Sequence, residues 1–365
     1  MLQKLVAWMR SDGLRPGAKA NPLKSRPQAP VTPLTEAPFS PNPGNLRMFR
    51  YLPKGVKAGA PLVVVLHGCG QTASGYDAGT GWSALATELG FALLAPEQKA
   101  VNNPNTCFNW FNPEDVARDG GECASIAAMI RTMIDDHKLD DSRVFITGLS
   151  AGGAMTAAML ATYPELFAGG AIIAGLPFGV AVNIRDALEA MRAAPLRTPH
   201  QWGDAVRAAS GYTGPWPKIS IWHGALDTTV NISNAQASMA QWADILGLSL
   251  AAARQELVDG VIRLSWDDRL EVYTVPTLGH GAPIDSRDLG SPAPFILEAG
   301  ISSTRRIAGF WGLVPRPVGK PAPVRIMTEP ALPAIEAVLA PRQVPQPVAE
   351  TLVRRALRAI GLLKR

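Results

Sequence analysis

A serine stands between glycines at the point where an apolar segment meets an alanine-rich one. Residues 148–152 read Gly-Leu-Ser-Ala-Gly, the G-x-S-x-G pattern that carries a nucleophilic serine on a sharp turn between a strand and a helix. The apolar residues 144–146 predict the strand, and residues 154–161 predict the helix. An ordinary glycine turn with Ser150 as a helix N-cap is the alternative. The elements on either side of the turn favour the nucleophile.

A serine hydroxyl becomes a good nucleophile only when a base takes its proton, so one of the five histidines is needed nearby. His280 follows a predicted strand at 271–275, and it comes last in the nucleophile–acid–histidine order of hydrolases that carry this turn. The other four are expected at strand ends, on a charged helix end and in an irregular Pro/Trp-rich segment: His67, His223, His137 and His200. The sequence therefore predicts His280 as the base.

The acid that orients this histidine should lie between the serine and the histidine, directly after a strand. Asp227 meets both conditions, because residues 219–222 predict a strand and a glycine turn follows them. Three other aspartates in the interval do not directly follow a predicted strand: Asp204, Asp244 and Asp259. Asp227 is therefore predicted to hold His280 in the correct tautomer. A turn aspartate that caps the next helix is the alternative.

Two backbone amides are needed to stabilise the oxyanion that forms when a serine attacks a carbonyl group. One should be the amide of Ala151, directly after the nucleophile. The second should come from the loop after the early strand, where His-Gly-Cys-Gly at 67–70 makes the amide of Cys69 the best candidate. These groups require neither a metal ion nor an organic cofactor.

The order of predicted elements gives the fold class. Strands alternate with helices along the chain, which predicts an α/β fold with a mostly parallel central sheet and helices on both faces. In such sheets the chemistry gathers at the carboxyl ends of the strands, where all of the residues above are expected. Strands are predicted at 62–66, 91–95, 144–146, 170–174, 219–222 and 271–275, and helices at 82–89, 121–137, 154–161, 183–192 and 233–246.

The charge of the chain is concentrated at its two ends. The 365 residues are 47% hydrophobic and 18% charged, which suits a globular protein with a large core, and the net charge is +5. Residues 1–28 hold six Lys/Arg and one Asp, and residues 316–365 hold nine Lys/Arg and three Glu, so the centre is negative. A nucleic-acid-binding body would need a basic face, and we therefore expect no nucleic-acid partner.

Composition also predicts the domain organisation. We expect a basic N-terminal arm over 1–44, a catalytic domain over 45–314, a Pro-rich linker over 315–347 and a basic amphipathic helix over 348–365. The apolar stretch at the start is too short for a signal peptide, so the expected location is cytoplasmic. Both basic ends carry apolar residues and could bind a membrane surface or a polymer granule. The sequence does not indicate the oligomeric state.

Three cysteines are spread over the first half of the chain: Cys69, Cys107 and Cys123. They form no C-x-x-C pattern and no cluster that resembles a metal site. Buried thiols in a reducing compartment are the default interpretation. A disulfide between Cys69 and Cys107 stays open, because both residues are expected near the active end of the sheet.

Seven segments between residues 61 and 313 together resemble the poly(3-hydroxybutyrate) depolymerase-type esterases of the α/β-hydrolase superfamily, a group that includes feruloyl and acetylxylan esterases. The segments are LHGCGQTASGYDAGTGW, LLAPEQ, NNPNTCFNWF, GLSAGGAMTAAMLATYPELFAGGAIIAGLPFG, WHGALDTTV, GHGAPID and LEAGISSTRRIAGFWGL. The resemblance implies Ser150, Asp227 and His280 as the catalytic triad. It also implies that Trp110 lines the acyl-binding cleft, with a core aromatic as the alternative.

The resemblance implies a serine carboxylesterase that acts on a small hydroxyalkanoate ester or oligoester. Secreted members that degrade polymer carry a signal peptide and a separate polymer-binding domain, which this sequence does not display, so short esters or oligomers are the expected substrates. An esterase that removes feruloyl or acetyl groups from plant polysaccharide is one alternative. A granule- or membrane-associated protein, with the esterase body as an addition, is another.

Overall fold

A ten-stranded sheet forms the centre of the computed structural model, which describes residues 32–314. The strand order is β1-β2-β4-β3-β5-β6-β7-β10-β9-β8, and the pairs from β4 to β10 are parallel, whereas the strands at both edges pair antiparallel. This confirms the predicted α/β-hydrolase class. The strands of the sheet are β1 (Thr35–Ala37), β2 (Arg47–Tyr51), β3 (Leu62–Leu66), β4 (Ala92–Glu97), β5 (Val144–Leu149), β6 (Gly169–Ile173), β7 (Lys218–Gly224), β8 (Arg254–Val258), β9 (Val261–Trp266) and β10 (Leu270–Val275), and a separate parallel pair is formed by β11 (Ala282–Ile284) and β12 (Ile296–Glu298).

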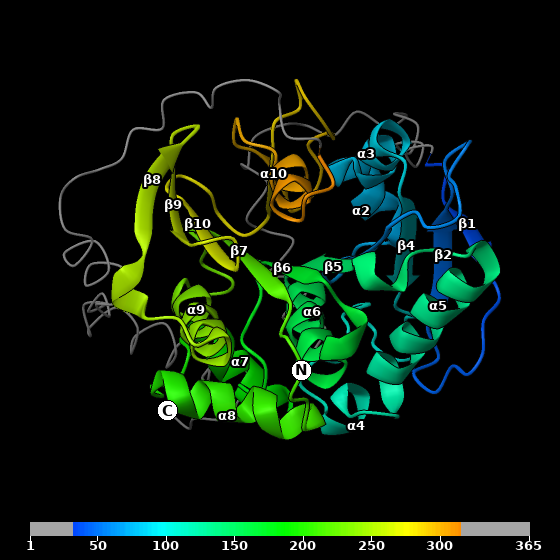
Figure 1. Ribbon diagram of the computed structural model, residues 1–365. Helices are drawn as coiled ribbons and strands as arrows, with labels where there is room; N and C mark the ends of the chain where they lie inside the picture. Colours follow the sequence, from blue (N-terminus) through cyan, green and yellow to red (C-terminus); the bar gives the residue numbers. More distant parts are fainter. Residues whose placement is uncertain (1–31, 315–365) are drawn as a thin grey trace, which may run out of the picture. The chain divides into compact units, whose positions relative to one another are not determined.

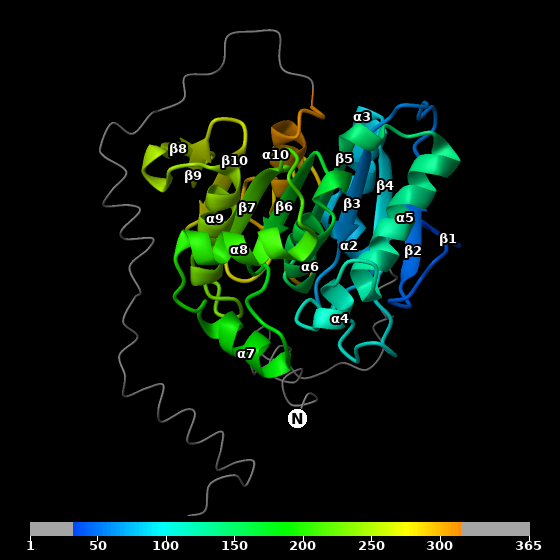
Figure 2. The same ribbon diagram turned by 60° about the horizontal axis from the view of Figure 1, so that its bottom comes forward.

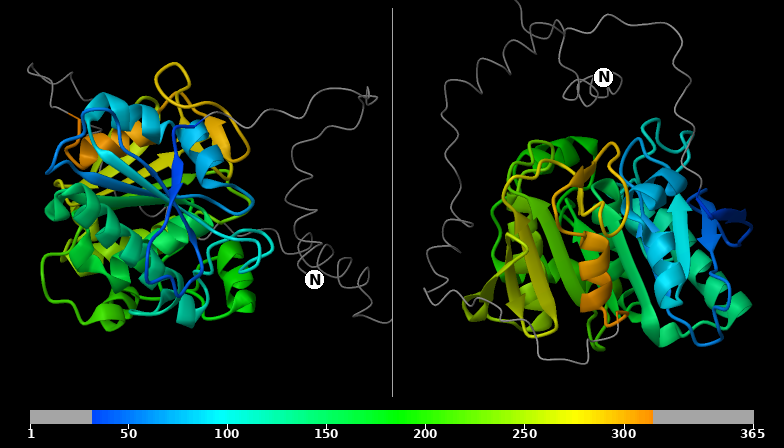
Figure 3. Two further views of the ribbon diagram at one scale, coloured as in Figure 1. Left: turned by 90° about the vertical axis from the view of Figure 1, so that its right-hand side faces the viewer. Right: turned by 90° about the horizontal axis from the view of Figure 1, so that it is seen from above.

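Helices cover both faces of the sheet (Figure 1). One face carries α2, α3 and α10, and the other carries α5, α6 and α9, with α8 packed on α9 (Figure 3, left). The helices are α2 (Ala73–Thr80), α3 (Trp82–Leu89), α4 (Pro113–Val116), α5 (Gly121–His137), α6 (Ala151–Thr162), α7 (Ile184–Arg192), α8 (Pro199–Ser210), α9 (Ser233–Leu246) and α10 (Ser303–Phe310), and the 3-10 turns are η1 (Asp141–Arg143), η2 (Pro164–Leu166) and η3 (Leu250–Ala252).

Strand β3 shows why the sheet needs cover on both sides. All five of its residues are buried, and alternate side chains enter different cores. Leu62, Val64 and Leu66 pack with residues of α5 and α6, whereas Val63 and Val65 pack with residues of α2 and α3. A strand with this continuous apolar run is stable only when both faces are shielded from water.

Several elements lie where the sequence did not indicate them. The sheet begins before the predicted boundary at Asn45, because Thr35–Ala37 pair with β2. The expectation of an irregular segment around His200 is wrong, since His200 lies in the first turn of α8, where Thr198 forms a capping box with Gln201. Proline at the first position of a helix is favourable, so Pro199 marks a start and not a break.

The predicted features of the two ends fall outside residues 32–314. These are most of the N-terminal arm, the Pro-rich linker and the amphipathic helix at 348–365, which stay predictions. Within residues 32–314, none of the helices combines the length and the apolarity needed to cross a bilayer.

Candidate active site

The serine turn lies between the end of β5 and the start of α6, as the sequence predicts. Ser150 has φ 57° and ψ −115°, a backbone conformation that residues other than glycine rarely adopt. The residues two positions before and after Ser150 must be glycine, because other residues would clash. A Cβ on Gly148 would lie 2.3 Å from the carbonyl oxygen of Gly152, and a Cβ on Gly152 would lie 2.4 Å from the carbonyl oxygen of Leu66. The amide of Ser150 donates to the carbonyl of Ile173 at 2.9 Å, which ties the turn to β6.

The structure brings Ser150, His280 and Asp227 into one chain of hydrogen bonds. Ser150 Oγ lies 2.9 Å from His280 Nε2, and His280 Nδ1 lies 2.7 Å from Asp227 Oδ2. The side chains of His280 and Asp227 are 8% and 0% exposed. Because an ionised Asp227 can only accept, Nδ1 carries the ring proton and Nε2 is free to accept from the serine hydroxyl.

Asp227 is held as a carboxylate by the groups around it. Its Oδ1 accepts from the amides of Thr229 and Val230 at 2.9 and 2.8 Å. Burial by itself would raise the pKa of Asp227, but the hydrogen bonds from His223 and His280 outweigh burial and hold the pKa well below its usual range. His223 Nε2 lies 3.4 Å from Asp227 Oδ2 and donates to the carbonyl of Val230 at 2.8 Å. The sequence did not indicate this second histidine beside the acid.

The two residues predicted for the oxyanion hole, Cys69 and Ala151, both line the recess beside Ser150. At the start of the loop that carries Cys69, His67 Nδ1 donates to the carbonyl of Gly68 at 2.8 Å, and His67 Nε2 accepts from the amide of Gln98 at 3.1 Å. Burial lowers the pKa of His67 to about 4, so its ring is neutral at neutral pH and keeps both bonds. His67 therefore supports the predicted oxyanion loop.

A disulfide joins Cys69 to Cys107. The default interpretation of both residues as buried thiols is thus wrong, whereas Cys123 is a buried free thiol, as expected. The bridge connects the loop of Cys69 to the segment that carries Trp110, and the amide of Gly70 donates to the carbonyl of Asn105 at 2.8 Å across the same junction. The cytoplasmic location stays a prediction.

An apolar recess lies beside Ser150, which forms part of its lining. Trp110 lines it, as the family resemblance implies, and also stacks edge-on against Phe111 with ring centroids 5.5 Å apart. Other lining side chains were missed in the sequence because they come from a strand, a helix and several loops with no shared pattern. They are Leu149, Leu176, Met191, Thr229, Val230 and Phe295. Figure 2 shows α4 and α7, which follow β4 and β6, at one end of the sheet strands.

The remaining histidines lie in other surroundings. His137 Nε2 lies 2.8 Å from a guanidinium nitrogen of Arg50, and His200 is 74% exposed beside Asp204. Within residues 32–314, no group of three or more His, Cys, Asp or Glu side chains is placed to hold a metal ion.

The chain is similar to several known ester hydrolases. Residues 46–258 match the sequence model of the family described as esterase PHB depolymerase, a span that includes Ser150 and Asp227 and stops before His280. The chain is 42% identical over 286 residues to poly(3-hydroxyalkanoate) depolymerase C of Paucimonas lemoignei, across 76% of this chain and 69% of that protein. It is 32% identical over 265 residues to feruloyl esterase B of Thermothelomyces thermophilus, across 69% of this chain and 89% of that protein. Among solved structures, an acetyl xylan esterase from Aspergillus awamori matches with a TM-score of 0.68 at 26% identity, across 77% of this chain and 99% of that one.

Proposed function

The chain belongs to the esterase PHB depolymerase family and is a carboxylic ester hydrolase. From that premise we propose that it hydrolyses short hydroxyalkanoate esters or oligoesters, with Ser150 as the nucleophile. The single observation that carries the mechanism is the 2.9 Å contact between Ser150 Oγ and His280 Nε2 at the edge of an apolar recess. The similarity to a poly(3-hydroxyalkanoate) depolymerase at 42% identity supports the substrate class.

The proposed reaction has two halves, and His280 moves the proton in both. His280 Nε2 takes the proton of Ser150 as Oγ attacks the ester carbonyl, and Asp227 stabilises the imidazolium that forms. The amides of Cys69 and Ala151 donate to the oxyanion. The carbon–oxygen bond to the alcohol breaks as His280 returns the proton to the leaving oxygen. Water then attacks the acyl carbon while His280 takes its proton; the bond from the acyl carbon to Ser150 Oγ breaks, His280 returns the proton to Oγ, and the carboxylic acid is released.

The lining of the recess supports a mainly aliphatic acyl group. Apart from Cys69, Ser150, Thr229 and His280, the lining is apolar, so a charged substrate group would lose hydration without gaining a partner. A feruloyl or acetyl group on a polysaccharide is the second candidate. Trp110 and Phe295 favour it, because both aromatic rings line the recess and could stack on a ferulate ring or a sugar.

A rate comparison separates the two candidates. The purified chain is assayed on hydroxybutyrate oligomers, on methyl ferulate and on p-nitrophenyl esters of graded acyl length, with Ser150→Ala as the background. The proposal expects the highest kcat/KM on the hydroxybutyrate oligomers. A kcat/KM on methyl ferulate at least tenfold above that on the oligomers would transfer the assignment to the second candidate.

A further inference from the structure

The histidine and one wall of the recess come from a single segment, residues 276–302, which we call the base loop. His280 lies near its start, and Phe295 packs edge-on against the His280 ring with centroids 5.8 Å apart. Within the base loop the amide of Ala282 donates to the carbonyl of Phe295 at 2.9 Å, and β11 pairs with β12. Among the described residues, these two strands pair only with each other and not with a strand of the main sheet. Contacts other than strand pairing must therefore hold the base loop in place.

Helix α10, which directly follows the base loop, folds back and holds it. Ser303 Oγ donates to the carbonyl of Pro283, in the middle of β11, at 2.8 Å. Arg305 Nε donates to both carboxylate oxygens of Asp288, just beyond β11, at 2.7 and 2.9 Å. Ser303 therefore fastens the strand that begins two residues after His280, and Arg305 fastens the segment that follows this strand.

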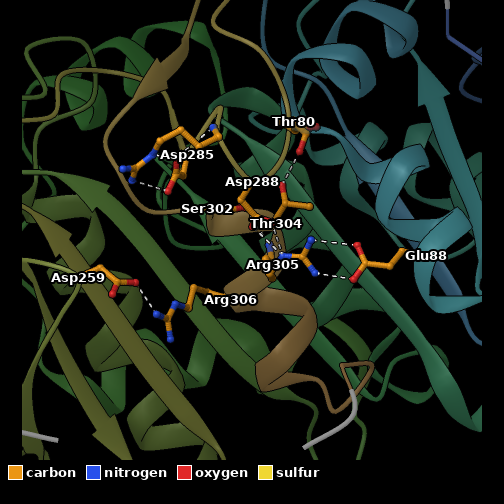
Figure 4. Close-up of polar contacts among 10 residues, drawn as sticks. Thr80, Glu88, Asp259, Asp285, Asp288, Ser302, Thr304, Arg305 and Arg306 are labelled. Atoms are coloured by element: carbon orange, nitrogen blue, oxygen red, sulfur yellow. Dashed lines mark hydrogen bonds and ion pairs between the residues drawn. The ribbon is translucent and has the colours of Figure 1, made fainter. Parts of the chain in front are cut away.

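The same helix is tied to the helices on its other side. Thr304 Oγ1 donates to the carbonyl of Thr80, the last residue of α2, at 2.9 Å. The guanidinium group of Arg305 forms a bidentate pair with Glu88 of α3 at 2.8 and 3.0 Å (Figure 4). Figure 3 (right) shows α10 between α2 and α3 on one side and the strands of the β8–β10 edge on the other. One guanidinium group thus joins two carboxylates from separate elements.

We propose that Arg305 is a positioning residue for His280: by bridging Glu88 and Asp288, it holds the base loop against α3 and keeps the histidine in line with Ser150. The inference rests on the proposed function, in which His280 is the base. It also gives a role to the segment ISSTRR, which the catalytic mechanism does not use. A misplaced base lowers the rate of the chemical step because proton transfer requires hydrogen-bond distance.

The next residue supplies a matched control. Arg306 lies on the same helix and is also paired with a carboxylate, but that carboxylate is Asp259 in the turn between β8 and β9 (Figure 4). The side chains of Arg305 and Arg306 are 30% and 43% exposed, so their removal should expose similar surface. Only the first pair reaches the base loop.

The test compares Arg305→Met with Arg306→Met at a temperature where circular dichroism shows both variants folded. On soluble p-nitrophenyl butyrate, Arg305→Met should lower kcat about tenfold, or about 1.4 kcal/mol in the barrier, with a smaller change in KM. Arg306→Met should keep kcat within about twofold of the wild type. Hydrogen exchange should become faster in peptides from 282–298 for Arg305→Met alone.

Equal kcat and equal exchange in the two variants would overturn the inference. If Arg305→Met does not fold, Asp288→Asn removes only the base-loop half of the bridge, and it must show the same lowered kcat and faster exchange when set against Arg306→Met. A wild-type chain without activity on any ester would contradict the proposed function instead. The exchange comparison would then still decide whether Arg305 holds the base loop.

Discussion

The turn that carries Ser150 and the base loop that carries His280 bring two atoms to within 2.9 Å, yet they reach this geometry by different means. The serine turn is shaped mainly by five consecutive residues between a strand and a helix, with two glycines that allow close packing against β3 and one backbone bond to β6. The base loop depends on residues far away in the sequence. Arg305 joins it to Glu88, which lies 217 residues earlier in the chain. Within the loop, the ring of Phe295 packs against His280.

The difference predicts which changes each region tolerates. At the serine turn the side chain can be removed without altering the backbone, because the close approach of glycines and carbonyl groups fixes the turn. In the base loop the backbone is held by side chains, so removing one of them should move the catalytic group. Glycine is also needed where the base loop packs against the end of β7, because a Cβ on Gly224 would lie 2.3 Å from the carbonyl oxygen of Leu278.

The strongest test of the serine turn is Ser150→Ala. We expect kcat to fall about 10⁶-fold, because the nucleophile is lost, with little change in the free energy of unfolding. Turnover of p-nitrophenyl butyrate and a thermal melt measure the two effects. A variant that keeps a tenth of wild-type activity would contradict the assignment of the nucleophile.

Asp227→Asn tests the attachment of the base to its acid. We expect kcat to fall about 10⁴-fold, because an amide can donate to His280 Nδ1 and so favour the wrong tautomer. Asp204→Asn is the matched control, since Asp204 lies on the exposed side of α8 and pairs with Arg207. If the two variants have the same kcat, another carboxylate orients His280.

Cys107→Ser tests whether the predicted oxyanion loop, like the base loop, is held in place by a bond to a residue far away in the sequence. Removing a bridge between residues 38 apart should lower the free energy of unfolding by about 4 kcal/mol. It should also lower kcat more than KM, because the loop of Cys69 loses its link to the segment of Trp110. Denaturant unfolding and steady-state kinetics give both values, with Cys123→Ala as the control that keeps the bridge. A variant as stable and active as the control would show that the bridge does not hold the loop.

The last prediction concerns acid pH and His67, which supports the same loop. Burial lowers the pKa of His67 from 6.5 to about 4, so the unfolded chain binds the proton first as pH falls. The wild type should therefore lose up to about 3 kcal/mol of stability between pH 6.5 and pH 4 through this group. His67→Asn should lack this contribution. If the free energy of unfolding falls equally with pH in the wild type and in His67→Asn, groups other than His67 cause the loss of stability in acid.

The sequence predicted the centre of the sheet better than its edges. The strands from β3 to β7 and β10 are apolar runs that a buried parallel sheet requires, so periodicity and composition found them. The edge strands β8 and β9 were missed, since they are partly exposed and carry Arg254, Glu256 and Arg263, whose charges resemble those of a loop. Their pairing, and that of β1 with β2, depends on neighbours that composition does not indicate.

The sequence was sufficient to nominate Ser150, Asp227 and His280, from their order along the chain and from the element that precedes each. Local backbone geometry imposes the G-x-S-x-G turn, and the carboxyl ends of parallel strands share one edge of the sheet. Tertiary structure alone decided what surrounds them. His223 beside Asp227, the Cys69–Cys107 bridge, Phe295 in the recess and the Arg305 bridge between Glu88 and Asp288 join residues from separate parts of the chain. Contacts of this kind leave no periodic trace in the sequence, since each depends on where a second loop lies in space and not on the spacing of residues within one segment.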